Sequence, residues 1–254
     1  MAKKEKEYKV PSTRQPVYSV FKLIIKCFFK RPKIINLAGE LAEKSIVLAN
    51  HSNKSGPPCL DMYYPRFNVK WGAYQMFGNY ASRKAYLRDV LYIKKCKKSR
   101  TKAVIASTLM ATVSQFVYKG MKMIPTYPDV RIAKTIRDSM KVLDANKTIM
   151  VFPEDSNDGY KEVLTDFFPG FVILSEKYYR ATGEDLPIYP VYYHITKRVM
   201  VIGEAVYMQD LVKQGMDRNQ IARFFCDKVN GLFFDYIQNG RYLEMEGYVE
   251  KKKK

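Results

Sequence analysis

Hydrophobic and polar positions along the chain predict an alternation of strands and helices. Short apolar runs bounded by turn-forming residues are typical of strands, and seven of them occur, at residues 33–37, 45–49, 67–73, 121–126, 148–152, 186–193 and 198–203. Helical periodicity occupies most of the intervals, at residues 80–94, 101–119, 129–146, 171–180 and 217–242. This order predicts an α/β protein: a single domain with a mixed, mostly parallel central sheet flanked by helices.

The N-terminal segment, residues 16–32, has the pattern of a basic amphipathic helix. Lysines recur every four residues, and large apolar residues cover most of the remaining helical circumference. At ~1.5 Å per residue the helix is too short to cross a bilayer. A position in the interface of an anionic membrane is favoured over packing of the same helix on the core. The residues expected to contact the membrane are Lys22, Lys26, Lys30, Phe21, Ile25 and Phe28.

The rest of the chain is predicted to be one folded unit with two tails. Residues 1–15 are a charged tail, residues 250–254 are a lysine tail, and residues 33–249 contain neither an internal repeat nor a linker. Residues 103–118 are uncharged, but at 16 residues they fall short of the ~18 that a membrane-spanning helix needs. The N-terminus does not resemble a signal peptide and the four cysteines lack paired spacing, so we expect a cytoplasmic protein without a metal site or a disulfide framework.

The chain is strongly basic, with 44 Lys and Arg against 25 Asp and Glu, a net charge of +19. Such an excess favours anionic partners: nucleic acid, an anionic membrane, a phosphorylated substrate or an acidic carrier protein. A basic nucleic-acid-binding protein is the weaker alternative, because no nucleic-acid-binding motif occurs and the aromatic residues lie within apolar runs. We therefore expect no nucleic-acid partner.

Two short strings place reactive side chains directly after predicted strands. His51, one of only two histidines, follows the apolar run 45–49, and Glu154 follows the run 148–152. Open α/β sheets bind their ligands at such strand ends. Imidazole has a suitable intrinsic pKa for removing a proton from a hydroxyl at neutral pH, so His51 is the candidate general base.

Four segments in sequence order resemble conserved blocks of the glycerolipid acyltransferase superfamily, which includes the 1-acylglycerol-3-phosphate acyltransferases. The segments are Asn50-His51 with a following Asp61, Gly120 to Pro125, Phe152-Pro153-Glu154, and Leu186 to Val191. The resemblance implies a glycerol-3-phosphate acyltransferase-like fold, acyl-CoA or acyl carrier protein as the cosubstrate, and no bound cofactor or metal. It also implies a lysophospholipid acceptor, and 1-acylglycerol-3-phosphate is the first candidate. The expected location is the cytoplasmic face of a membrane, with peripheral or monotopic attachment.

The resemblance assigns His51 as the base and an aspartate as its orienting partner. The family places four residues between the two, but here that position is Gly56, and Asp61 follows after nine. We favour an insertion at residues 53–58 that brings Asp61 back to His51, because turn-forming residues can be looped out. Two other interpretations stay open: the partner is lost or supplied from elsewhere, or Asp61 caps a helix.

The acceptor side of the site also departs from the family pattern. By resemblance Glu154 helps to bind the acceptor, but Asp155-Ser156-Asn157 stands where the family has Gly-Thr-Arg, which weakens phosphate binding through a lost bidentate partner. The further substrate-binding candidates are Ser156, Arg131, Lys122, Lys54 and Gly170, the last in an aromatic/glycine step typical of the family. For the cations among these candidates, the alternative interpretation is an exposed surface charge that binds no substrate. The basic stretch 94–102 is either a docking site for an acidic acyl carrier protein or anionic lipid, or a solvated loop.

Overall fold

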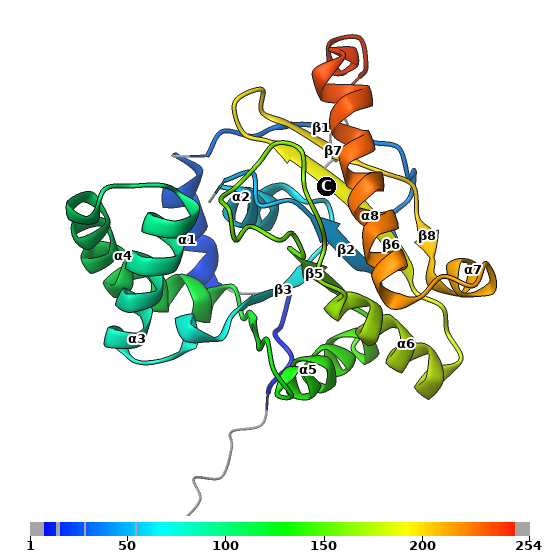
Figure 1. Ribbon diagram of the computed structural model, residues 1–254, viewed down its shortest axis with the longest axis horizontal. Helices are drawn as coiled ribbons and strands as arrows, with labels where there is room; N and C mark the ends of the chain where they lie inside the picture. Colours follow the sequence, from blue (N-terminus) through cyan, green and yellow to red (C-terminus); the bar gives the residue numbers. More distant parts are fainter. Residues whose placement is uncertain (1–7, 14–15, 28, 54, 247–254) are drawn as a thin grey trace, which may run out of the picture.

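The computed structural model describes residues 8–13, 16–27, 29–53 and 55–246 and has a mixed, mostly parallel sheet at its centre (Figure 1). The sheet has eight strands in the order β1-β7-β6-β2-β5-β3-β4, with β8 paired to β6. The strands are β1 (Lys33–Asn36), β2 (Ile46–Ala49), β3 (Asn68–Ala73), β4 (Ile124–Thr126), β5 (Thr148–Val151), β6 (Pro187–His194), β7 (Val199–Ile202) and β8 (Val206–Tyr207). Among the named strands of the described residues, the β6–β7 and β6–β8 pairings are antiparallel and the other five are parallel. The predicted α/β class and mostly parallel sheet are thus confirmed.

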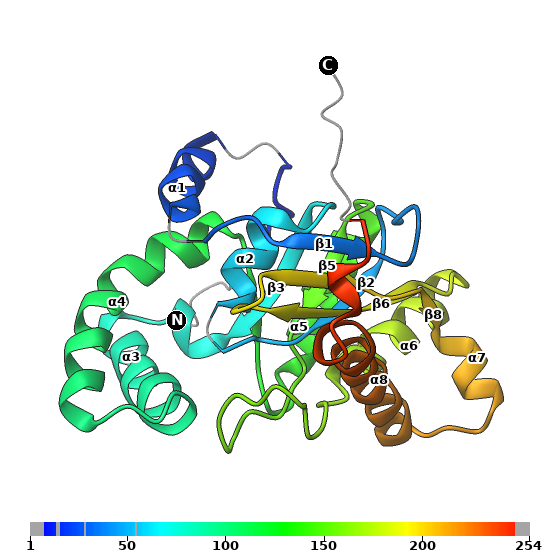
Figure 2. The ribbon, with the colours of Figure 1, turned by 90° about the horizontal axis from the view of Figure 1, so that it is seen from above.

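Helices flank this sheet on both faces, as Figure 2 shows. They are α1 (Pro16–Lys26), α2 (Gly56–Tyr63), α3 (Tyr80–Ala85), α4 (Arg100–Gly120), α5 (Ile132–Asp144), α6 (Gly170–Thr182), α7 (Met208–Lys213) and α8 (Arg218–Leu232). Shorter 3-10 or π-helical turns are η1 (Tyr74–Phe77), η2 (Tyr86–Lys95), η3 (Phe233–Gln238) and η4 (Arg241–Leu243). None of the helices in the described part of the chain has the length and apolar content to cross a membrane.

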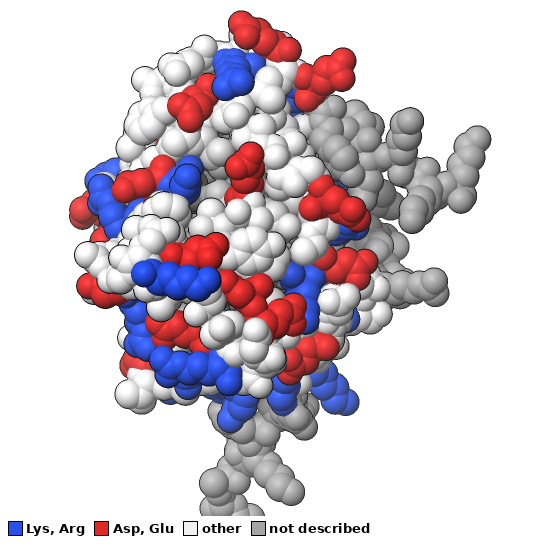
Figure 3. Space-filling view, turned by 90° about the vertical axis from the view of Figure 1, so that its right-hand side faces the viewer, with Lys and Arg blue, Asp and Glu red and all other residues white. Residues whose placement is uncertain are grey.

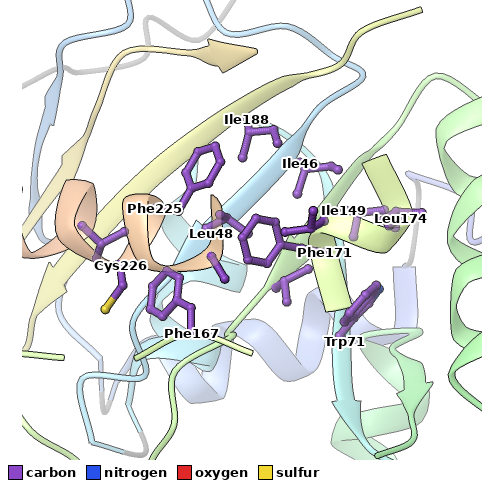
Figure 4. Packing of buried hydrophobic residues seen from close by; sticks show 14 of the residues in the cluster. Ile46, Leu48, Trp71, Ile149, Phe167, Phe171, Leu174, Ile188, Phe225 and Cys226 are labelled. Atoms are coloured by element: carbon purple, nitrogen blue, oxygen red, sulfur yellow. The ribbon is translucent and has the colours of Figure 1, made fainter. Parts of the chain in front are cut away.

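The two faces of the sheet are buried in separate clusters because successive side chains of a strand point to opposite sides. Ile46 and Leu48 of β2 join the larger cluster, where Phe171 of α6 meets Phe225 of α8 edge to face (Figure 4). Val47 of β2 faces the smaller cluster, under α2. Burial on both faces explains why the strands read as continuous apolar runs.

A helical insertion, residues 74–123, joins β3 to β4 and contains α3, η2 and α4; its helices lie at the left of Figure 1. A third cluster holds these helices together, with Leu87 and Tyr92 of η2 packed among Met76 and the alanines of α4. Helix α1 packs against the carboxyl end of this insertion. The ring of Tyr18 occupies the space that a side chain at Gly120 would need. The side chains of Phe21 and Ile25 and all of Phe28 and Lys54 lie outside the described residues.

Candidate active site

His51 and Glu154 come together because β2 and β5 are parallel neighbours. Ile46 of β2 is in register with Ile149 of β5, so the two strands end at the same edge of the sheet. His51 follows β2 by two residues, and Glu154 follows β5 by three. The strand order therefore places the two side chains, which are far apart in the sequence, side by side.

The Glu154 carboxylate contacts His51 through both of its oxygens. The backbone N–H of His51 donates to Oε2 at 2.9 Å, and Nδ1 of the His51 ring lies 3.1 Å from Oε1 in a direction outside hydrogen-bond geometry. The Glu154 side chain is only 4% exposed and that of His51 is 21% exposed. Within the described part of the chain no group hydrogen-bonds Nε2 of His51. The ring thus has a carboxylate beside one nitrogen, and its other nitrogen is available to a ligand.

The loop that carries His51 is fixed by the residues on either side. The amide of the buried Asn50 donates to the carbonyl of Tyr193 and accepts from its N–H, which ties the end of β2 to β6. Ser52 and Asn53 then adopt left-handed φ angles of 42° and 62°, and the Ser52 hydroxyl accepts from the N–H of Ile195. Consecutive left-handed residues reverse the chain sharply, so the chain turns directly after His51.

The loop that carries Glu154 folds back on itself. Glu154 forms an isolated antiparallel bridge with Phe167, and the flanking N–H of Phe168 donates to the carbonyl of Pro153. This pairing fixes the backbone at both sides of the carboxylate. A buried glutamate held in this way can keep one geometry while a ligand binds and leaves.

Two aromatic rings and one lysine complete the surroundings of His51. The His51 ring centroid lies 5.0 Å from that of Phe152 and 5.2 Å from that of Tyr160, and Nζ of Lys95 lies 5.6 Å from the Tyr160 centroid. Burial lowers the pKa of Lys95, although Glu154 and Asp155 nearby act in the opposite direction. Lys95 is thus a partly buried cation at the site.

The sequence analysis did not single out Lys95, which lies in the basic stretch 94–102. This stretch leaves η2 beside the site: Nζ of Lys94 donates to Oδ1 of Asn157, and the thiol of Cys96 approaches Oδ1 of Asn53 at 3.7 Å. The amino part of the stretch is therefore not a freely solvated loop. No sequence signal could have shown this, because the contact joins segments about sixty residues apart.

The expected pairing of Asp61 with His51 is wrong. Asp61 lies inside α2, where its carboxylate contacts Nζ of Lys70 at 2.6 Å and Nζ of Lys22 at 2.8 Å and accepts from the hydroxyl of Tyr18. Burial by itself would raise the pKa of Asp61, but the two lysines outweigh it and hold the pKa below its usual value. Asp61 therefore anchors α1 and β3 to α2, and the carboxylate at His51 is that of Glu154.

The insertion proposed for residues 53–58 is also wrong, because Gly56 already begins α2. Prolines 57 and 58 occupy its first turn, where a missing N–H removes no helical hydrogen bond, and Ser55 rather than Asp61 is the N-cap residue. The N–H of Gly56 donates to the carbonyl of His51 at 2.7 Å. A Cβ at position 56 would lie 2.4 Å from that same oxygen, so no aspartate fits at this position.

We expect Gly56→Ala to lower the free energy of unfolding by about 1–3 kcal/mol, because the methyl group meets fixed backbone rather than a mobile side chain. Chemical denaturation followed by circular dichroism measures this change. Gly231→Ala is the matched control: a Cβ there meets nothing within 4 Å, and alanine is favoured over glycine within α8. Equal stability of the two variants would contradict the steric explanation.

The other substrate-binding candidates lie apart from the His51–Glu154 pair. Arg131 follows β4, where it pairs with Asp129 at 2.6 Å, and its guanidinium lies 4.9 Å from the ring centroid of Tyr74 and 4.6 Å from that of Tyr127. Lys122 precedes β4 and is exposed. Gly170 begins α6 and packs against Trp71. Of these candidates in the described residues, only Ser156 belongs to the Glu154 loop; it is buried, and its hydroxyl has no hydrogen-bond partner in that part of the chain.

Of the membrane candidates, Lys22 is directed inward to Asp61, so it is not free to meet headgroups. Lys26 and Lys30 are exposed. The reason for the difference is local: the buried Asp61 attracts the one lysine of α1 that can reach it.

Comparison with known proteins does not assign the chain to a family: no family model matches it, and no curated protein matches it either. The class of the protein is therefore that of its fold, an α/β protein with a mixed, mostly parallel sheet. In the described residues no group of three or more histidine, cysteine or acidic side chains is arranged to hold a metal ion. The His51–Glu154 pair, with Lys95 and Tyr160 around it, is the candidate active site.

Proposed function

We propose that this protein is an O-acyltransferase with a glycerol-3-phosphate acyltransferase-like fold that moves an acyl chain from a thioester to the hydroxyl of a lysophospholipid. The observation that carries the proposal is the contact between His51 and the buried Glu154 carboxylate at the carboxyl edge of a mostly parallel sheet. The four sequence segments that resemble the glycerolipid acyltransferases support it independently. Acyl-CoA or acyl carrier protein is the proposed donor.

In the proposed reaction Nε2 of His51 accepts the proton of the acceptor hydroxyl as its oxygen attacks the thioester carbonyl carbon. A new C–O bond forms and the C–S bond breaks. The imidazolium then returns its proton to the departing sulfur, which leaves as a free thiol. Because an alcohol is a weak nucleophile at neutral pH, the base supplies the main chemical assistance that side chains at this site can offer.

Glu154 is proposed to be a positioning residue rather than an acceptor-binding one. A carboxylate 3.1 Å from Nδ1 favours the tautomer with its proton on that nitrogen and stabilises the imidazolium that forms during attack. Its second oxygen holds the His51 backbone N–H, which restricts movement of the ring's attachment point. This is the role that the family pattern assigns to an aspartate at the position now held by Gly56.

A phosphate-bearing acceptor, 1-acylglycerol-3-phosphate in the first place, is supported by Lys95. The lysine is partly buried and close enough to Glu154 and Asp155 to interact with both charges, and it supplies a cation where the third block lacks its arginine. Arg131 is a weaker candidate because Asp129 already neutralises it. The alternative is an acceptor without phosphate, because Asn157 stands where the family pattern has its phosphate-binding arginine.

Attachment to the cytoplasmic face of an anionic membrane is the proposed location. Exposed Val20 and Leu23 of α1, next to the exposed Lys26, support contact with an interface. Both apolar side chains are more than half exposed. A lysophospholipid acceptor is available at such a surface.

The test is the release of free thiol from acyl-CoA or acyl carrier protein in the presence of lysophosphatidate. We expect thiol release that depends on the acceptor, with a product whose mass equals that of the acceptor plus one acyl group. Lysophosphatidylglycerol and monoacylglycerol serve as alternative acceptors that differ at the phosphate. Thiol release no faster with an acceptor than without one would reject acyl transfer, whereas equal rates with monoacylglycerol would reject phosphate recognition by Lys95.

A further inference from the structure

Helix α4 exposes large apolar side chains and buries small ones, which is the reverse of the pattern of a helix that faces only water. Its buried positions are small: Ala103, Ser107, Ala111 and Ser114. Six large apolar residues of α4 are exposed: Val104, Ile105, Leu109, Met110, Val113 and Phe116. Leu109 is 67% exposed and Phe116 is 70% exposed. A water-facing helix buries its large residues and exposes polar ones, so this outer face of α4 has the composition of an interaction surface.

The segments that lead into and out of α4 carry charges of one sign. No charged residue occurs between Lys102 and Lys119, a stretch of 16 residues that is ~24 Å long as a helix. Between Asp89 and Asp129 the chain has eight Lys or Arg residues and no Asp or Glu. By contrast, the opposite end of the molecule, where α6 to α8 lie, shows both signs intermixed (Figure 3). The segments directly before and after the apolar face of α4, residues 94–102 and 119–122, thus carry cations and no carboxylates.

The same surface continues onto α1. Tyr18 of α1 packs against Gly120 at the carboxyl end of α4, so the exposed Val20 and Leu23 lie on the helix next to that end (Figure 2). At the amino end of α4, the segment after η2 leads back to Lys95 beside Glu154. The exposed face of α4 and the cation at the candidate active site, Lys95 of η2, therefore belong to the same helical insertion.

We propose that the outer face of α4 lies in the surface of an anionic membrane and is, together with α1, the docking surface of the protein. Large apolar side chains flanked by cations match the acyl region and the phosphates of such a surface. A second copy of the chain fits less well, because it would bring two rims of like charge together. The inference rests on the membrane part of the proposed function, but it does not require acyl transfer.

The test is sedimentation of the full chain with vesicles of phosphatidylglycerol and phosphatidylcholine in equal parts. We expect Leu109→Glu/Phe116→Glu to lower the bound fraction at least about tenfold, because two carboxylates replace apolar groups at the interface. Val212→Glu/Leu243→Glu is the matched control: it adds the same charge at exposed apolar positions outside α1 and α4 and should bind as the unmodified protein does. Thermal unfolding checks that both variants fold.

Each outcome decides the proposal. Failure of the unmodified protein to bind these vesicles, or equal binding by both double variants, overturns it. Self-association in vesicle-free buffer that only Leu109→Glu/Phe116→Glu abolishes would assign the face to a second copy and also overturn it. Thiol release with a short-chain, water-soluble lysophosphatidate, measured without vesicles, separates this inference from the proposed function: vesicle binding without turnover refutes the enzyme and leaves the docking surface.

Discussion

Replacing His51 with alanine is expected to lower the rate of acyl transfer about 10²–10⁴-fold, the usual contribution of a positioned general base. In the described residues no group hydrogen-bonds Nε2 of the imidazole, and a carboxylate lies beside its other nitrogen. Initial rates of thiol release at saturating donor measure the loss. His194→Gln is the matched control, since the other histidine of the chain lies at the end of β6 and is engaged by Glu162 and Lys197.

Glu154→Gln distinguishes the two roles that a carboxylate could have at this site. Glutamine keeps an oxygen for the His51 N–H but removes the charge beside Nδ1. If Glu154 positions the base, kcat falls at least about 10²-fold while KM for the acceptor stays unchanged. If it binds the acceptor instead, KM rises. Unchanged rates for both His51→Ala and Glu154→Gln would remove the catalytic assignment of the pair.

Replacing Asp61 with asparagine is expected to lower the free energy of unfolding by about 3–5 kcal/mol, the usual effect of breaking a buried ion pair. The side chain of Lys70 is fully buried, and its ammonium is held by Asp61 and by Oδ1 of Asn68. Without the carboxylate, a buried positive charge loses its counter-ion. Lys22 and Tyr18 of α1 lose their partner at the same time. Equilibrium denaturation measures the change.

Asp61→Asn/Lys70→Met is the variant that tests the reason for this loss. Because it removes both buried charges, we expect most of the lost stability to return. Asp89→Asn is the surface control; its ion pair with Arg88 is exposed, so it should change stability by less than about 1 kcal/mol. A single and a double variant of equal stability would show that the charge of Lys70 does not cause the loss.

The effect of Asp61 should also depend on pH. Its pKa is lower in the folded protein than in the unfolded chain, so its stabilisation is complete above the unfolded value near 4 and disappears as the pH falls through the folded value. The unmodified protein should therefore lose stability relative to Asp61→Asn below about pH 4, and the two denaturation curves should converge there. A constant difference between the two proteins down to pH 2 would contradict this linkage.

The strands were predictable because they carry their own signal. Seven of the eight strands in the described residues are short apolar runs between turn formers, and burial on both faces makes such a run nearly continuous, as in Ile46 to Ala49; the two-residue β8 was not predicted. The boundary at residues 56–58 differs from the prediction because proline has two local preferences. Prolines 57 and 58 favour a loop by composition, but the first turn of a helix also accepts proline, and α2 begins there.

The partner of His51 was not predictable, because the choice between Asp61 and Glu154 depends on neighbours far away in the sequence. Asp61 is nearer along the chain, but Lys70 on β3 and Lys22 on α1 both reach it, and a buried lysine needs a carboxylate. Glu154 reaches His51 only because β5 lies beside β2 in the sheet. The proximity of Lys95 has the same origin, since it depends on how the helical insertion packs.

The sequence by itself determined the α/β class, seven of the eight strands in the described residues, the position of His51 directly after a strand, and the long uncharged stretch of residues 103–118. These features follow from local periodicity and composition, which any chain segment carries with it. The tertiary structure alone decided which carboxylate meets His51, that Lys22 is directed inward, and that the large apolar residues of α4 face outward. Strand order and packing bring distant residues together, and the physical reason is that buried charges and apolar surfaces select their partners in space rather than along the chain.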